Sequence, residues 1–125
     1  MDPRTLVNLD VNEGLSILAA LDTEKITVVA ALWMVSPDDE EWQLVLSSPS
    51  LDQSHPLRAY EKVAEALHKH SMYMRPPIVI LPTENSFIRD LRSTFGKAKR
   101  VDGMRLGGQT IGNRFISDAY VYRVQ

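Results

Sequence analysis

The chain has 125 residues, no cysteine and a formal net charge of −2. The lack of cysteine excludes a disulfide framework, a thiolate nucleophile and cysteine-ligated zinc or iron–sulfur sites. Its length and its composition, with 44% hydrophobic and 24% charged residues, are those of an ordinary globular protein and predict a single folded domain over residues 1–125.

The first predicted element is a helix over Glu13–Asp22, which follows Asn12, a favourable N-cap residue. Apolar residues recur within it at helical spacing, and only Gly14 argues against a helix. The apolar run over 15–21 is too short to span a bilayer, and the first residues lack the basic flank of a signal peptide. We therefore expect a cytoplasmic protein that does not enter a membrane.

Two strands are predicted next. Residues 26–35 are rich in β-branched side chains and are apolar on both alternating faces, which predicts a central strand covered on two sides. Residues 36–41 have turn chemistry, and residues 42–47 then alternate as a second strand would. Together the two segments predict an antiparallel hairpin.

A polar connection leads to a second helix, predicted from Pro56 to about Ser71. Glu65 and Lys69 lie on its outer side at a favourable i, i+4 spacing. The side chains expected to face inward are Leu57, Tyr60, Val63, Ala64 and Leu67. After this helix, the short apolar run 78–81 predicts a buried strand.

A third helix is predicted over Glu84–Phe95, with Thr83 as its N-cap and Gly96 as a left-handed C-cap. Beyond it, Gly112-Asn113 is the signal of a two-residue hairpin turn, which joins strand 104–111 to strand 114–124. Pairing outward from that turn sets Thr110 opposite Phe115, Leu106 opposite Ala119 and Met104 opposite Val121.

The predicted order of elements is α-β-β-α-β-α-β-β. This order indicates an α+β domain in which about three helices cover a mixed, mainly antiparallel five-stranded sheet. The order of the strands within the sheet does not follow from the pattern.

A glycine-rich segment, residues 103–110, fits the phosphate-binding pattern G-x-x-x-x-G-K-[ST] except that Gln109 stands where a lysine is needed. A P-loop must also open into a helix, whereas a hairpin turn follows here. We therefore predict that Gly107-Gly108 forms a bulge or a bend in the hairpin. The alternative is a close approach of a partner backbone or of a ligand, such as a small anion held near these glycines by Arg105 or Arg114.

Charge is segregated along the chain. Residues 1–71 hold 5 Lys or Arg and 12 Asp or Glu, a balance of −7, whereas residues 72–125 hold 9 and 4, a balance of +5. Six cations of the second half lie close together in sequence: Arg89, Arg92, Lys97, Lys99, Arg100 and Arg105. They could contact a nucleic-acid backbone with salt-dependent affinity. We favour a solvated or internally paired surface, because charge runs are common on ordinary proteins.

Neither the acidic turn nor the histidines predict a metal site. Residues 38–41 lack the glycine and ligand spacing of a calcium loop, so solvation of a turn is the better interpretation, with contact to a basic partner patch as the alternative. His68 and His70 stand two apart on a helix and do not converge on one ion. No nucleophile elbow is present, so we expect no catalytic residue, no metal and no cofactor.

The last strand is apolar on both faces. Strict alternation places one set of side chains on a common face: Ile116, Tyr120, Tyr122 and Val124. Either helices cover both faces, or this face meets another subunit. We therefore predict a small protein-interaction domain that self-associates as a homodimer and binds a protein partner. Nucleic-acid binding is the second hypothesis, and an enzyme acting on a small anionic ligand is the third.

Overall fold

The computed structural model describes residues 6, 8–52, 55–73, 77–98 and 100–125. In this part of the chain, no helix is long and apolar enough to cross a membrane. The helices are α1 (Asn8–Thr23), α2 (Pro49–Asp52), α3 (Pro56–His68) and α4 (Ser86–Phe95). The strands are β1 (Ala30–Val35), β2 (Gln43–Ser47), β3 (Ile78–Ile80), β4 (Met104–Arg105), β5 (Gln109–Ile111), β6 (Arg114–Ile116) and β7 (Asp118–Val124).

The main sheet has five strands in the order β3-β2-β1-β7-β4, and β5 pairs with β6 in a separate two-stranded sheet. β1 is antiparallel to both β2 and β7, and β2 is parallel to β3. The predicted α+β class and the mixed five-stranded sheet are therefore confirmed. The predicted β1–β2 hairpin is also confirmed, and β1 lies at the centre of the sheet, as its apolar sequence indicates.

The last hairpin has the predicted register but is divided between the two sheets. Thr110 lies opposite Phe115, and Met104 lies opposite Val121. Between these pairs the strand bends at Gly107-Gly108, where Gly108 has a φ of +65° and its N–H donates to the Ile116 carbonyl at 2.9 Å. Glycine is favoured at such a positive φ because it has no Cβ. The bend predicted from the two glycines is confirmed.

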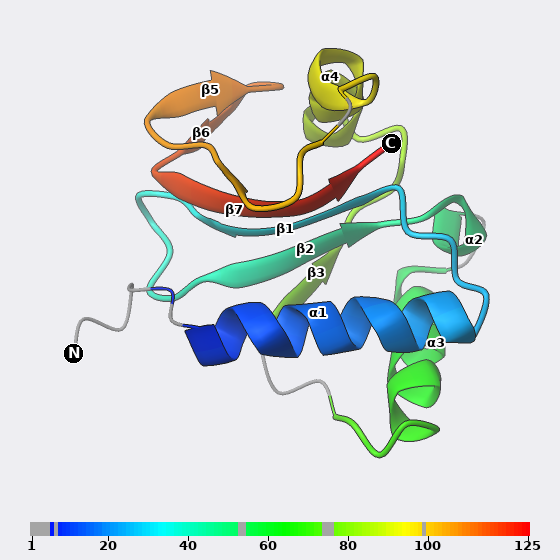
Figure 1. The fold of residues 1–125 in the computed structure, drawn as a ribbon. Helices are drawn as coiled ribbons and strands as arrows, with labels where there is room; N and C mark the ends of the chain where they lie inside the picture. Colours follow the sequence, from blue (N-terminus) through cyan, green and yellow to red (C-terminus); the bar gives the residue numbers. More distant parts are fainter. Residues whose placement is uncertain (1–5, 7, 53–54, 74–76, 99) are drawn as a thin grey trace.

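The main sheet is covered on both faces, in three layers (Figure 1). α1 and α3 pack on one face, over side chains that include Trp33, Leu44 and Tyr122. α4 and the β5–β6 hairpin pack on the other, over side chains that include Val121. Every residue of β1 is buried. Burial of each large aliphatic side chain contributes about 1.5–3 kcal/mol, so the two covered faces hold the layers together.

α3 differs from its predicted form in length and in the face it buries. It ends at His68, three residues earlier than expected. Its buried residues are Ala59, Val63, Ala66 and Leu67, while Leu57 is 64% exposed and Ala64 is exposed. The prediction for these two positions was wrong, because the buried face of α3 is rotated from the predicted stripe toward Ala59 and Ala66. The helix instead turns two small alanines, together with Val63 and Leu67, toward the core.

The ion pairs of α3 and the caps of α4 also differ from prediction. Lys69 pairs with Glu24 at the end of α1, at 3.3 Å, and Glu65 pairs with Arg58 within α3. The side chain of Asn85, not that of Thr83, caps α4 by accepting from the Phe87 N–H at 2.9 Å. Gly96 has a φ of −62° and is not left-handed. The ion pairs and the N-cap differ because Glu24 on another segment, Arg58 on the same helix and the neighbouring Asn85 supply the partners.

Candidate functional site: a pocket between α1 and β7

One polar chain sets the position of α1 over the sheet. Trp33 on β1 donates from Nε1 to the Tyr122 hydroxyl at 2.8 Å, and that hydroxyl donates to the Val11 carbonyl on α1 at 2.7 Å. α1 comes so close to this ring that a Cβ at Gly14 would lie 2.2 Å from the hydroxyl oxygen. The glycine that seemed unfavourable for the helix is therefore the residue that permits the contact.

A β-bulge in β7 brings the next side chain to the same face. The register shifts between Ala31 and Leu32, so Tyr122 is an extra residue and Arg123 pairs with Ala31. A bulge reverses the alternation of side chains beyond it. As a result, Tyr122 and the following Arg123 both face α1.

Arg123 makes a bidentate ion pair with Asp22 near the end of α1, with N···O distances of 2.9 and 2.8 Å. The same guanidinium donates to the Val28 carbonyl at 3.3 Å. Hydrogen bonding to Arg123 lowers the pKa of Asp22, and the reciprocal hydrogen bond raises the pKa of Arg123. The pair thus closes one end of the space between α1 and β7, and its charges neutralise each other.

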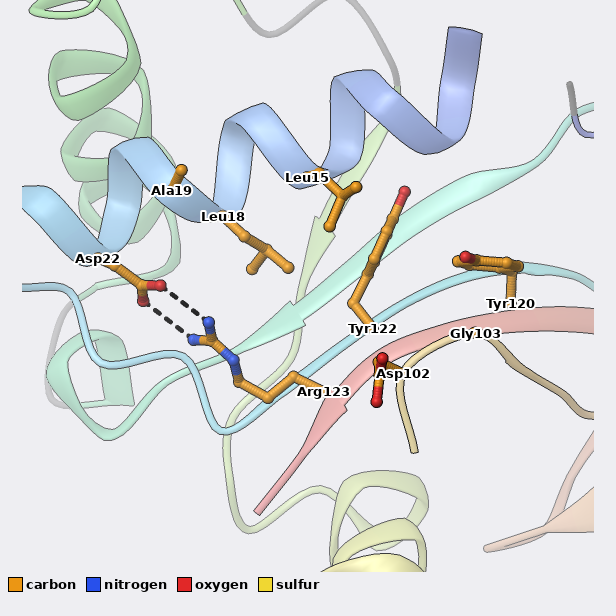
Figure 2. Close-up of a pocket in the computed structure, with 9 residues that line it drawn as sticks. All are labelled: Leu15, Leu18, Ala19, Asp22, Asp102, Gly103, Tyr120, Tyr122 and Arg123. Atoms are coloured by element: carbon orange, nitrogen blue, oxygen red, sulfur yellow. Dashed lines mark hydrogen bonds and ion pairs between the residues drawn. The ribbon is translucent and has the colours of Figure 1, made fainter. Parts of the chain in front are cut away.

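Between α1 and β7 lies a cavity of about 400 Å³ (Figure 2). Its lining comes from three parts of the chain: α1, β7 and the segment that precedes β4. The lining residues are Leu15, Leu18, Ala19, Asp22, Asp102, Gly103, Tyr120, Tyr122 and Arg123. Figure 2 shows the α1 side chains on one side and the two tyrosines on the other. The lining combines an aliphatic wall with aromatic rings and a few charged groups.

The two tyrosines meet edge to face, with ring centroids 5.3 Å apart and an interplanar angle of 70°. Such pairs are a favoured aromatic geometry and hold both rings in place. Burial raises the pKa of the Tyr122 hydroxyl, which therefore stays protonated and serves as a hydrogen-bonding anchor. The Tyr120 hydroxyl lies against Gly103, where an added Cβ would be 3.6 Å away. The segment containing Asp102 is thus next to the polar end of Tyr120.

The described cations of the predicted basic cluster are divided between two sides of the sheet. Arg89 is exposed on α4, and Arg92 on the same helix donates to the Gln125 carbonyl at 2.7 Å. Arg105 lies opposite Tyr120, on the α1 side, where it is bonded to Asp118.

The remaining members of the cluster lie after α4. Lys97 is exposed, and Arg100 is 3.9 Å from Asp102. Lys99 is outside the described residues. Of the two arginines proposed to hold an anion near the glycines, Arg105 is engaged by Asp118, and Arg114 lies 5.4 Å from the centre of the Phe87 ring. Nucleic-acid binding by these residues stays an untested hypothesis.

The expectation that Ile116, Tyr120, Tyr122 and Val124 share one face was wrong. Ile116 and Val124 belong to the core under α4, whereas Tyr120 and Tyr122 pack on the α1 side. The bend at Ser117 and the bulge at Tyr122 each shift the alternation by one residue. Ile116, Tyr122 and Val124 are also buried within the chain itself.

Metal-ligating side chains do not gather in the described ranges, where no group of three or more His, Asp or Glu could hold an ion. His70 instead lies 3.0 Å from Glu24, and His68 contacts the ring of Tyr73. In the acidic turn, the Asp39 carboxylate accepts from the Ser36 N–H at 2.8 Å, which is a turn interaction.

Sequence reasoning did not identify the pocket. Two signals for it were present, namely a glycine within an otherwise regular helix and a charged Arg123 within an apolar strand. The first marks a close approach and the second marks the bulge.

Comparisons of this chain with protein-family models, with curated proteins and with solved structures found no match.

Proposed function

We propose that this protein is a binding domain that holds a small organic ligand in the pocket between α1 and β7. The observation that carries the proposal is the cavity itself. Its volume of about 400 Å³ falls within the range of small-molecule sites. Leu15 and Leu18 offer apolar contact, while Asp102 and the Tyr120 ring offer polar contact, the mixture that such sites use.

The interaction role predicted from the sequence remains a proposal with less to support it. Both edges of the main sheet are short, since β3 has three residues and β4 has two. At the β3 edge, the Ile80 N–H donates to the Tyr60 hydroxyl of α3 at 3.0 Å. Short and occupied edges disfavour pairing with another chain. The homodimeric state and the cytoplasmic location also remain proposals, and light scattering after size exclusion tests the first.

Titration of ¹⁵N-labelled protein with a library of small ring-containing compounds tests the pocket. Binders should shift the amide signals of the pocket-lining segments 15–22, 102–103 and 120–123. Ala19→Trp should abolish these shifts, because Ala19 is exposed and lines the cavity, so the indole fills it without entering the core.

The matched control is Ser16→Trp, which places the same side chain at an exposed position of α1 outside the lining. This variant should bind as the natural protein does. Shifts confined to other surfaces, or equal loss in both variants, would contradict the proposal.

A further inference from the structure

The charged groups that line the pocket are not equally available to a ligand. Arg123 is held by both carboxylate oxygens of Asp22 and by the Val28 carbonyl. Asp102 is in a much weaker ion pair, with Arg100 at 3.9 Å. The Arg100 side chain is 86% exposed and the Asp102 side chain is 66% exposed. An exposed pair at this distance contributes little. The net charge that the lining presents is therefore negative.

The α1 wall of the pocket is apolar except for Asp22, which is paired with Arg123. A ligand that enters between α1 and Asp102 therefore meets an aliphatic wall on one side and the weakly held carboxylate of Asp102 on the other. This field attracts cations and repels anions.

The aromatic rings favour the same ligand charge. Tyr120 is partly exposed and lines the cavity beside the segment that carries Asp102. The face of a tyrosine ring attracts an ammonium group, and a neighbouring carboxylate adds to this attraction. On the opposite wall, Leu15 is 52% exposed and can cover an apolar body.

On the basis of the proposed function, we infer that the ligand is a small organic amine with an apolar ring or chain. Its ammonium group lies at the end of the pocket formed by Asp102 and Tyr120. Its apolar part lies against Leu15 and Leu18 of α1. An anionic ligand of the same shape is disfavoured, because the one guanidinium in the lining already has its carboxylate partner.

Three probes of matched shape test the charge of the ligand: tryptamine, indole-3-ethanol and indole-3-propionate. NMR titrations at pH 7 should give the tightest binding for the amine and the weakest for the acid. The amine should exceed the neutral alcohol by about two- to five-fold, the range of a cation–aromatic contact at a partly exposed site. Raising the salt concentration should reduce this ratio.

Asp102→Asn should bring the amine-to-alcohol ratio close to one while the alcohol binds as before. Asp90→Asn is the matched control, because Asp90 is an exposed carboxylate on α4, on the other side of the sheet. This control should keep the full ratio.

The two proposals fail in different ways. If the alcohol binds at the pocket as tightly as the amine, or the acid binds tighter, the inferred ligand charge is wrong and the pocket still binds. If none of the three probes and no library compound shifts the pocket amides, the proposed function itself is wrong.

Discussion

The two faces of the main sheet are built from the same strands but pack differently. Under α4, the inward side chains of β7 are Ala119, Val121 and Val124, which are all buried. Under α1, the inward side chains are two tyrosines and an arginine, and one tyrosine is held by hydrogen bonds at its far end. Small aliphatic residues pack into the core under α4, whereas large anchored residues line a cavity on the α1 side.

The largest expected difference in the free energy of unfolding comes from a Leu→Ala substitution made once on the α4 side of the sheet and once on the α1 side. Leu91→Ala on α4 removes a fully buried side chain and should lower the free energy of unfolding by about 3 kcal/mol. Leu15→Ala in the pocket removes a side chain that is 52% exposed and should lower it by less than about 1 kcal/mol. Urea denaturation measures both values. Equal losses would show that the two sides are packed alike.

Gly14→Ala should lower the free energy of unfolding by about 2 kcal/mol, because overpacking outweighs the gain of about 1 kcal/mol in helix propensity. The new Cβ would meet the Tyr122 hydroxyl and ring carbons at 2.2 to 2.8 Å, so α1 must shift away from β7. Thermal and urea unfolding measure the change. Ser16→Ala, at an exposed position of the same helix, should cause no loss. A stable Gly14→Ala protein with unshifted Tyr122 signals would argue against the close approach.

Tyr122→Phe should lower the free energy of unfolding by about 1.5 kcal/mol, since it leaves a buried donor without its acceptor. That donor is Nε1 of Trp33, a residue that is only 3% exposed. Urea unfolding gives the change, and the Trp33 indole N–H signal should move in the NMR spectrum. Tyr73→Phe is the control, because Tyr73 is 67% exposed. Similar small effects in both variants would show that the polar chain does not position α1.

The smallest effect concerns the Asp22–Arg123 pair and is seen as a pH dependence. Because folding lowers the pKa of Asp22 from its usual 3.8, its stabilisation is present above that value and is lost as pH falls through the folded pKa. The Asp22 side chain is 46% exposed, so the coupling should be about 0.5 kcal/mol. A double-mutant cycle of Asp22→Asn and Arg123→Gln should show this coupling at pH 7 and not at pH 2. A coupling that persists at pH 2 would contradict the ion pair.

Local sequence patterns determined much of the fold. Turn residues at 112–113 set the register of the last hairpin, and the apolar run of residues 26–35 identified the central strand. These predictions succeeded because turn chemistry and side-chain alternation depend on residues a few positions apart. The helix caps and the inward face of α3 were less predictable, because several neighbouring residues could serve and the packing partner selects among them.

The site was decided by the tertiary structure. Trp33 and Tyr122 are 89 residues apart in sequence, and Asp22 and Arg123 are 101 residues apart. A bulge at Tyr122 changes which way the side chains that follow it in β7 face. The sequence alone therefore determined the type of each main element and the register of the last hairpin. The order of the strands, the bulge and the pocket required the folded chain, because each arises from contacts between distant residues that no local pattern encodes.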